Sequence, residues 1–485
     1  MRGARYWNTG LLAVVLILGA TARIVPIAAN RFHQDEALYS YWALLIASGR
    51  DPELLSVYVD KPPLFLYSLA LAFKLLGPSE VTARLVSEMA SIASIGLLYY
   101  LASVLYDRPT ALAATTLMAF SPFNILFAPT AFTDPLMVAW VLAALCLAAK
   151  GRAGWAGLTL GLAMATKQQG ALFAPLVIFL IALNPKARSS KGWMRFALGI
   201  SAAMGPTTWW DSLRWHIRPS YLDRSLTTCG GLALVDPSKL GERLLGWAKV
   251  LGYVTASLPL NLLFLLGFPL LLIYDLHRNK AGLLDLPLGA FVLLFLLVHW
   301  LLSFEVWDRY LLGIVPLLAM LMARVALVAI KQVSGGEAAG HMAALLLIAC
   351  LAAPAWKAAH SEYPIGGDHW AYDGIDQVSF YFREKVPPGS VLYHHWLGWH
   401  YSFYMFGLPL DLRWYDSPSK LAEDASQKAD VRRYIVFPSW KSETEVRAAL
   451  AEKGLVLQPL YQTYRRDGSV SFAIYEITKV ASKAY

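Results

Sequence analysis

The stretch RFHQDEALYSYW, residues 31–42, places two adjacent carboxylates, Asp35 and Glu36, shortly after a hydrophobic segment. That segment, from about residue 7 to residue 29, is interrupted only by Arg23, and it is long enough to cross a bilayer, which takes about 20 apolar residues. A neighbouring pair of acids is ordinarily part of a solvated loop or the acidic first turn of a helix. Other polar clusters along the chain favour a functional role, so we expect Asp35 and Glu36 to lie at a membrane surface.

The composition is that of a polytopic membrane protein. Of 485 residues, 57% are hydrophobic and only 15% are charged, and the mean hydropathy is +0.47, whereas a soluble domain of this length needs far less apolar sequence. The three cysteines are far apart, which predicts neither a disulfide framework nor a metal-binding cysteine pair. The net charge of +9 fits basic loops beside a membrane and does not indicate a nucleic-acid partner.

Hydropathy along the chain predicts eleven spans, the first of which we interpret as a retained anchor and not a cleaved signal peptide. Alternate short loops carry an excess of Lys and Arg, which marks the cytoplasmic side. This charge pattern is consistent through every span and supports the count. The predicted spans are approximately residues 8–28, 82–105, 110–128, 132–149, 153–166, 170–184, 193–210, 249–274, 285–303, 310–330 and 341–358.

The same orientation places a group of charged residues, and everything after about residue 359, on the outer face. Because a charge costs about 3 kcal/mol at the centre of a spanning helix, charges gathered near one surface indicate a reaction site at the membrane interface and not a path through the membrane. The residues of this group are Asp35, Glu36, Asp60, Lys61, Asp134, Lys167, Asp308 and Arg309.

The first outer loop, about residues 30–81, is apolar enough to form helices lying along the membrane. One is predicted in EALYSYWALLIASG and a second in PLFLYSLALAFKLLG, residues 63–77. Pro62 and Pro63 favour an extended turn followed by the first helical position, so Asp60 and Lys61 are expected to project where that helix starts. Treating the second segment as a twelfth span would move the basic loops outside, and we reject it for that reason.

Two outer residues also have ordinary structural interpretations. In APTAFTDPLM, residues 128–137, Thr133 or Asp134 fits the N-cap of a helix, which does not exclude a functional role. Arg309 at the outer end of a span fits an interfacial side chain whose charge reaches water. Its guanidinium is equally suited to bind a phosphate.

Residues 360–485 change character and predict a small α/β domain outside the membrane. The HHxxxxH spacing of His394, His395 and His400 is not a recognised metal-ligand pattern, so packing roles are expected. The last predicted element is a hairpin that turns at 467–468. Before it come a helix in DGIDQVSFYFREKV, β structure in SVLYHHWLGWHYSFYMFG, a helix at 418–429, the strand RYIVFPSW and the helix ETEVRAALAEKG.

Taken in order, these features resemble the GT-C superfamily of polytopic glycosyltransferases. They are most similar to the branch that includes dolichyl-phosphate-mannose protein mannosyltransferases and the lipid A aminoarabinose transferase. The resemblance spans about the first 330 residues, and the combination in this order is specific although each motif alone is weak. The motifs are DEALYSYWA at 35–43, DKPPLFLYSLALAFKLLG at 60–77, ARL at 83–85, SPF and FTDPL within 121–136, and DRYLLGIVPLLAML at 308–321.

The resemblance implies a GT-C-like transmembrane domain in residues 1–359, and the change of character after it predicts an extracytoplasmic domain in residues 360–485. It implies transfer of a sugar from a polyprenyl-phosphate donor to a lipid, glycan or protein acceptor at the outer face of the cell membrane. Asp35 would be the catalytic carboxylate or the group that positions the acceptor, with Glu36 supporting it. Asp134 matches the acidic residue of the second outer loop.

The resemblance further implies that Lys61 contacts the donor phosphate and that Arg309 lies near it. Asp60 matches a position that binds a divalent metal ion in some relatives. Fixed cations suit a lipid-phosphate leaving group, because they stabilise the negative charge that develops on it, and an acceptor hydroxyl needs a carboxylate base within hydrogen-bond reach. The apolar helices would supply a groove for the isoprenoid chain.

Two other classes remain open. A transporter or flippase for lipid-linked sugars would also be polytopic, but it is expected to show internal repeats and broken helices with polar groups near the midplane, and we find neither pattern in the sequence. A non-catalytic scaffold would not need carboxylates and cations gathered on one face. The sequence does not identify the sugar, the acceptor or the length of the prenyl chain.

Overall fold

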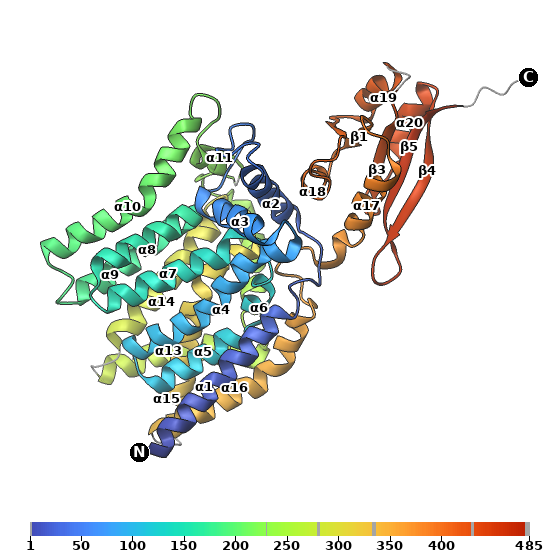
Figure 1. The fold of residues 1–485 in the computed structure, drawn as a ribbon. Helices are drawn as coiled ribbons and strands as arrows, with labels where there is room; N and C mark the ends of the chain where they lie inside the picture. The colour runs from blue at the N-terminus through green and yellow to red at the C-terminus, as the bar shows by residue number, and fades with distance from the viewer. Residues whose placement is uncertain (1, 229, 279–281, 332–335, 428–430, 481–485) are drawn as a thin grey trace, which may run out of the picture. The chain divides into compact units, whose positions relative to one another are not determined.

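The computed structural model describes residues 2–228, 230–278, 282–331, 336–427 and 431–480. Contacts divide the chain into two compact units (Figure 1). The first unit holds Met1–Ala29 and Leu45–Gly367, and the second holds Asn30–Leu44 and Asp368–Tyr485. The acidic stretch that follows the first hydrophobic segment therefore groups with the C-terminal part of the chain. The domain boundary expected at 359/360 stays a prediction.

The first unit is built of helices, with no sheet among its described residues. By length and apolar composition, five of the described helical stretches suffice to cross a membrane, at 80–105, 258–275, 284–301, 308–331 and 338–359. The unit's helices are α1 (Arg2–Ile24), α3 (Pro63–Leu76), α4 (Glu80–Leu105), α5 (Arg108–Phe120), α6 (Pro122–Phe127), α7 (Thr133–Ala149), α8 (Ala153–Thr166), the 3₁₀ helix η1 (Gln168–Phe173), α9 (Ala174–Leu183), α10 (Ser190–Arg214), α11 (Tyr221–Thr228), η2 (Pro237–Lys239), α12 (Leu240–Gly252), α13 (Leu258–Arg278), α14 (Gly282–Leu301), η3 (Asp308–Ile314), α15 (Val315–Lys331) and α16 (Gly336–Ala359).

The third predicted span, residues 110–128, contains a break that the hydropathy pattern does not show. Helix α5 ends at Phe120 and α6 begins at Pro122. Proline has no N–H to donate and disfavours helical geometry in the residue before it, and Ser121 is accordingly extended, with φ −63° and ψ 121°. The hydroxyl of Ser121 donates to the carbonyl oxygen of Val254 at 2.6 Å, so the break is tied to a distant turn.

The eighth predicted span, residues 249–274, is wrong at its start. Helix α12 ends at Gly252, and α13 begins only at Leu258. The amide of Asn261 donates to the carbonyl oxygen of Gly252 at 2.9 Å and accepts from the hydroxyl of Thr255 at 2.8 Å. Backbone groups at an interrupted helix lose their partners within the helix. The Asn261 side chain supplies hydrogen bonds in their place.

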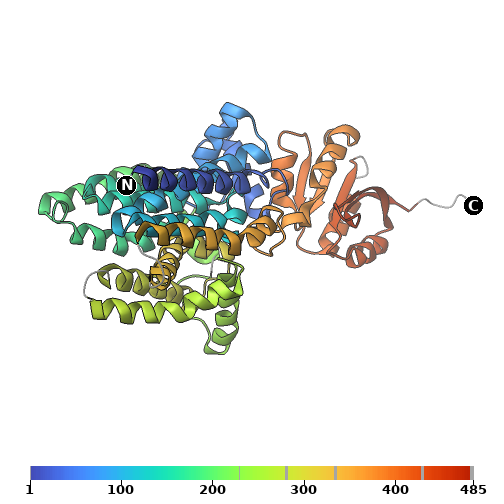
Figure 2. The same cartoon turned by 90° about the horizontal axis from the view of Figure 1, so that it is seen from below.

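Arg23, the charge within the first span, is fully buried and joins three helices. Its guanidinium donates to the hydroxyl of Ser91 at 3.0 Å and to the carbonyl oxygens of Gly19, Met118 and Ala119 at 2.7–2.9 Å. Buried charges are tolerated when such hydrogen bonds replace water. Helix α1 also lies alongside α16, from the other end of this unit, in Figure 1 and Figure 2.

Glycines let α8 and α10 pack backbone against backbone. A Cβ atom added at Gly157 would lie 2.1 Å from the carbonyl oxygen of Phe196, and one at Gly199 would lie 2.2 Å from that of Gly154. Small residues at four-residue spacing are the usual means of close approach between helices in membranes. The helix that ends just before Lys167 is therefore fixed along much of its length.

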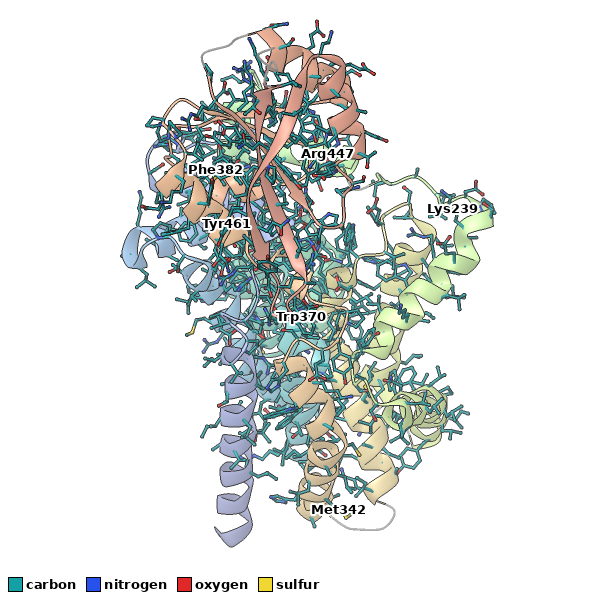
Figure 3. All side chains as sticks on the ribbon, turned by 90° about the vertical axis from the view of Figure 1, so that its right-hand side faces the viewer. Lys239, Met342, Trp370, Phe382, Arg447 and Tyr461 are labelled. Carbon is teal, nitrogen blue, oxygen red and sulfur yellow. The ribbon has the colours of Figure 1, made fainter. Side chains whose placement is uncertain are left out.

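The second unit contains a five-stranded sheet of order β2-β1-β3-β5-β4, in which β1 pairs in parallel with β2 and β3, and β5 runs antiparallel between β3 and β4. Helices α17 and α18 cover one face, and α19 and α20 cover the other. Phe382 on α17 and Arg447 on α20 mark these faces in Figure 3. The elements are α2 (Gln34–Ala47), which continues into the first unit, η4 (His369–Tyr372), α17 (Ile375–Lys385), β1 (Val391–His394), α18 (Gly398–Tyr404), β2 (Asp411–Trp414), α19 (Pro418–Gln427), β3 (Arg433–Pro438), α20 (Thr444–Glu452), β4 (Leu455–Tyr464) and β5 (Val470–Lys479).

The aromatic stretch at 390–407 departs from the β structure that its composition suggests. Only β1 is a strand there, and α18 follows it. Leu397, Tyr401 and Met405 are all buried in one core, and their four-residue spacing is that of a helix face. The final hairpin is confirmed, with Gly468 at φ +82° in its turn.

Candidate active site

The DKPP segment forms the turn that the sequence predicts. Pro62 is extended, with φ −61° and ψ 153°, and α3 starts at Pro63. The ammonium of Lys61 lies 2.5 Å from Oδ2 of Asp60, and the Lys61 side chain is buried. The amide of Gln168 donates to the carbonyl oxygen of Asp60 at 2.8 Å, so this turn is tied to the turn that follows α8.

Asp134 lies in the first turn of α7 and is 1% exposed. The expected N-cap role is wrong, because Phe132 occupies the N-cap and no side chain caps the helix there. Instead, Oδ1 of Asp134 lies 2.5 Å from the ammonium of Lys167, the C-cap residue of α8. That ammonium also lies 4.7 Å from the centre of the Tyr310 ring. The pair joins α7, α8 and η3 within the first unit.

Arg309 lies in η3, one residue after the start of that helix. The central carbon of its guanidinium lies 5.1 Å from the ring centre of Phe132 and 5.4 Å from that of Trp307, so it makes cation–π contacts with two aromatic rings. Asp308 accepts from the backbone N–H of Arg309 at 2.8 Å and from that of Gly366, also at 2.8 Å. The half-buried guanidinium is thus positioned by both side-chain and backbone contacts.

Two cations from other turns act on Lys167. Burial lowers the pKa of Lys167, the positive charges of Arg309 and Lys61 lower it further, and Asp134 opposes them. We call Lys61, Lys167 and Arg309 the cation cluster. Asp60 and Asp134 each pair with one of the two lysines. A cluster of fixed donors with this charge is suited to bind a phosphate group.

Asp35 and Glu36 lie in the second unit, in the first turn of α2. Oε2 of Glu36 accepts from the backbone N–H of His33 at 2.9 Å, which is the returning half of a capping box. The backbone N–H of Asp35 donates to Nδ1 of His33 at 3.0 Å. Glu36 is buried and Asp35 is half-buried, so Glu36 fixes the start of the helix that presents Asp35.

C-terminal residues of the same unit hold this acidic stretch. Nε2 of His33 lies 3.4 Å from Oδ2 of Asp368. Nε2 of His400 donates to the carbonyl oxygen of Phe32 at 3.0 Å. Asp35 also acts on Tyr372, because burial raises the pKa of that phenol and the negative charges of Asp368 and Asp35 raise it further. The sequence gives no local signal for these contacts, since the partners are more than 300 residues apart.

The sequence places Lys167 in the outer-face group of charged residues, but it assigns no specific role to Lys167 or to the neighbouring Gln168 and Gln169. Lys167 completes the cation cluster, and Gln168 holds the DKPP turn. The amide of Gln169 donates to the carbonyl oxygen of Tyr310 at 2.9 Å and lies 3.0 Å from Nε2 of His299. The sequence feature that could have indicated these roles is the run of polar residues between two apolar helices, because buried polar groups need hydrogen-bond partners.

The described residues do not fit a resident metal ion beside Asp60. Its Oδ1 is buried and has no hydrogen-bond partner there, but its Oδ2 pairs with Lys61. Among the described residues, no group of three or more His, Cys, Asp or Glu side chains is close enough to hold a metal. A divalent ion bound by Asp60 stays a prediction, and no chemical step is derived through one.

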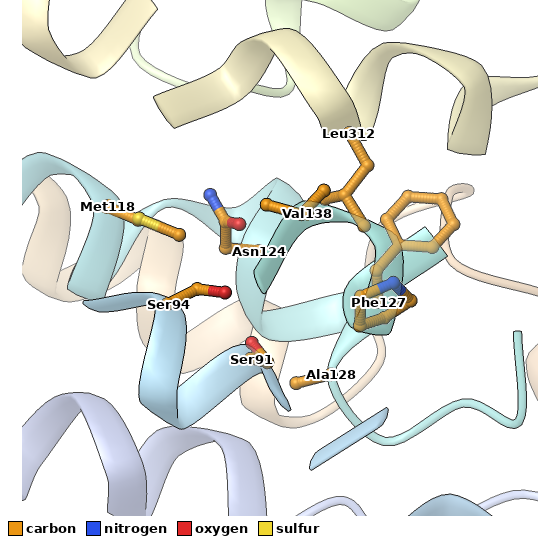
Figure 4. A pocket seen from close by; sticks show the side chains of 9 residues that line it. Ser91, Ser94, Met118, Asn124, Phe127, Ala128, Val138 and Leu312 are labelled. Atoms are coloured by element: carbon orange, nitrogen blue, oxygen red, sulfur yellow. The ribbon is translucent and has the colours of Figure 1, made fainter. Parts of the chain in front are cut away.

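A cavity inside the helices of the first unit is too small for a substrate. It measures about 10 Å³ and is lined by Ser91, Ser94, Asn124 and Leu312 among others (Figure 4). That is about the space that one water molecule occupies. The cavity is therefore a packing defect whose walls are mostly apolar.

Comparison with known proteins gives a family match over part of the chain. Residues 60–210 match the family model of the dolichyl-phosphate-mannose-protein mannosyltransferases, which confirms the resemblance predicted from the motifs. The match covers less than half of the chain but includes Asp60, Lys61, Asp134 and Lys167. No curated protein matches the chain by sequence.

The fold is similar to that of two kinds of solved structure. ArnT from Cupriavidus metallidurans, bound to undecaprenyl phosphate, superposes with a TM-score of 0.67 at 14% identity, covering 98% of each chain. The oligosaccharyltransferase of Archaeoglobus fulgidus in its apo form gives 0.54 at 12% identity, covering 96% of this chain and 74% of that one. The predicted fold class is confirmed: a multi-pass helical membrane protein with a C-terminal mixed sheet. Its orientation stays a prediction.

Proposed function

We propose that the protein is a membrane glycosyltransferase of the GT-C type that moves a sugar from a polyprenyl-phosphate donor to an acceptor at the extracytoplasmic face. The observation that carries this proposal is the cation cluster, Lys61, Lys167 and Arg309, held at three helix-terminal turns. Two of its members lie in the segment that matches the mannosyltransferase family. The similarity to ArnT, which was solved with undecaprenyl phosphate bound, supports a lipid-linked donor.

On the donor side, Lys61 and Arg309 are the groups that we assign to the phosphate. The ammonium of Lys61 pairs with Asp60. When the donor binds, its phosphate would replace Asp60 as the anionic partner of this ammonium. Charge-assisted hydrogen bonds of this kind are about twice as strong as neutral ones. Because the leaving polyprenyl phosphate gains negative charge as its bond to the sugar breaks, fixed cations stabilise the transition state more than the ground state.

On the acceptor side, we assign the base or positioning role to Asp35. In a one-step displacement, the acceptor oxygen forms a bond to the anomeric carbon while the bond from that carbon to the phosphate oxygen breaks. The electron pair leaves with the polyprenyl phosphate, and the acceptor proton goes to the Asp35 carboxylate. Glu36 keeps the first turn of α2 capped through His33, so the carboxylate of Asp35 is presented from a fixed backbone.

The test is a transfer assay with the purified full chain, a panel of labelled polyprenyl-phosphate sugars and a total membrane extract as the source of acceptor. We expect one donor to be consumed, with release of polyprenyl phosphate and transfer of the label to a membrane component. If every donor stays intact while the protein carries labelled donor across a vesicle membrane, the protein is a transporter of lipid-linked sugars and the proposal fails.

A further inference from the structure

A second and much larger cavity lies in the first unit, where α8 and α10 both begin. Its volume is about 650 Å³, which falls within the range of small-molecule binding sites. It is formed by the turn that precedes α8, by the connection from α9 to α10 and by the first turns of α10. Nothing in the proposed transfer reaction uses this cavity, because its lining includes no residue of the cation cluster.

The lining of this cavity is positively charged. Arg152, Lys186 and Arg195 contribute three cations from three segments of chain, and none of the described residues that line it carries a carboxylate. Like charges that converge on one space repel one another unless an anion lies between them. Arg152 and Arg195 each offer a planar fork of donors that matches a phosphate.

The backbone around the cavity adds to this potential. Ala153 and Gly154 in the first turn of α8, and Ser189 and Gly192 at the start of α10, all line it. The positive ends of two helix dipoles therefore meet at the same space, and each favours an anion there.

One wall of the cavity is apolar and exposed. The Trp155 side chain is 62% exposed and that of Leu198 is 60% exposed, and both line the cavity. In a multi-pass membrane protein, an exposed tryptophan and leucine beside basic helix ends mark the boundary between headgroups and acyl chains. A ligand that fits both the basic wall and the apolar wall therefore carries a phosphate with a hydrocarbon group next to it.

We propose that this cavity binds the phosphate headgroup of an anionic phospholipid, with Arg152, Lys186 and Arg195 on the phosphate and the acyl chains along Trp155 and Leu198. The positive loops place it on the predicted cytoplasmic side, where anionic lipids attract basic segments. The proposal does not rest on the proposed glycosyltransferase function, and it holds for any sugar donor.

The test measures binding of phosphatidylglycerol to the purified full chain by native mass spectrometry, with phosphatidylcholine as the neutral reference. The pocket variant is Arg152→Gln/Arg195→Gln. The matched control is Arg188→Gln/Lys191→Gln, which removes the same charge near the same helix start from residues that do not line the cavity. We expect the control to bind as the wild type does and the pocket variant to bind roughly 10- to 30-fold more weakly.

Equal losses in both variants would overturn the proposal, because they would mean that the basic loop attracts lipid without a defined site. Binding of phosphatidylcholine as strong as that of phosphatidylglycerol would overturn it as well. Displacement of the lipid by millimolar inorganic phosphate would identify a small-anion site instead. The melting temperature without added lipid checks folding, and Lys186→Gln, which changes only an exposed turn residue, replaces the pocket variant if that variant does not fold.

Discussion

The acidic side chains of the predicted site differ in how deeply each is buried. Asp134 is 1% exposed and pairs with Lys167, and Glu36 is buried and caps α2. Asp35 is half-buried, so it is the member of the predicted catalytic trio whose carboxylate is most open to an acceptor. A base must come within hydrogen-bond reach of the proton that it removes, and a carboxylate already committed to a buried partner is poorly suited to that task.

Asp35→Asn should lower the rate of sugar transfer by about 10²- to 10⁴-fold, the usual contribution of a general base. The amide keeps the shape of the side chain, and the cap from Glu36 to His33 stays in place, so the melting temperature should not change. Gln34→Ala, at the exposed neighbouring position, is the control. If Asp35→Asn kept most of the activity and the pH profile did not change, Asp35 would have no part in the mechanism.

Lys167→Met should destabilise the protein by about 3–5 kcal/mol, because it leaves Asp134 as an uncompensated buried charge. Adding Asp134→Asn to Lys167→Met should recover part of that loss. The measurement is denaturant unfolding in detergent, arranged as a double-mutant cycle. Lys150→Met, at an exposed lysine, is the control. If the two substitutions change the free energy of unfolding additively, the ion pair between Asp134 and Lys167 contributes no coupling free energy, and the prediction is wrong.

Much of this site could be predicted at the residue scale, and the missing part has a definite physical origin. The motifs at 60–77 and 308–321 single out Asp60, Lys61 and Arg309, and the resemblance implies the roles of these residues. The pairing of Asp134 with Lys167 joins positions 33 residues apart. The pairing depends on how α7 and α8 pack against each other. The sequence pattern within each single helix does not predict that packing.

At the element scale, prolines made some boundaries predictable, and aromatic composition concealed others. The start of α3 at Pro63 follows directly from its sequence. The strand β2, Asp411–Trp414, has only four residues, which is too short for alternation to stand out. In α18, the buried four-residue spacing of Leu397 and Tyr401 outweighs the β preference of aromatic residues.

The packing of α18 predicts a loss of stability in acid. Burial lowers the pKa of His400 to about 4, while an unfolded histidine titrates near 6.5. Between these values the unfolded chain binds a proton that the folded chain does not, so stability is full above pH 6.5 and falls as the pH falls towards 4. The loss is roughly 3 kcal/mol when complete, and His394, whose pKa burial also lowers to about 4, adds to it.

Hydrogen exchange of the α18 amides, corrected for the intrinsic pH dependence of exchange, measures this loss. Protection should decrease from pH 7 to pH 4.5 in the wild type and decrease less in His400→Gln. Protection that stays constant or increases over that range in the wild type would contradict the assignment of a buried neutral imidazole that donates to Phe32.

At the scale of the whole molecule, orientation decides whether the cation cluster faces the outside. The basic loops predict that it does. Five of the described helical stretches are long and apolar enough to cross a membrane, and α8 is among the shorter apolar helices. Cysteines introduced at Glu53 and Thr227 should react with impermeant thiol reagents from outside, and one at Ser190 should not. Cys229 is replaced first. Labelling of the Ser190 position from outside would invert the topology.

The central claim is that Lys61 belongs to the site for the donor phosphate, and direct binding of undecaprenyl phosphate to the purified full chain tests it most directly. Lys61→Gln is compared with Lys61→Arg and with Lys74→Gln, which removes an exposed lysine from the last turn of α3, the helix that follows Lys61. We predict that Lys61→Gln raises the Kd roughly 10- to 100-fold, the worth of one hydrogen bond to a charged group. Lys61→Arg should recover part of the affinity, and Lys74→Gln should bind as the wild type does. A Kd for Lys61→Gln equal to that of the wild type would contradict the account.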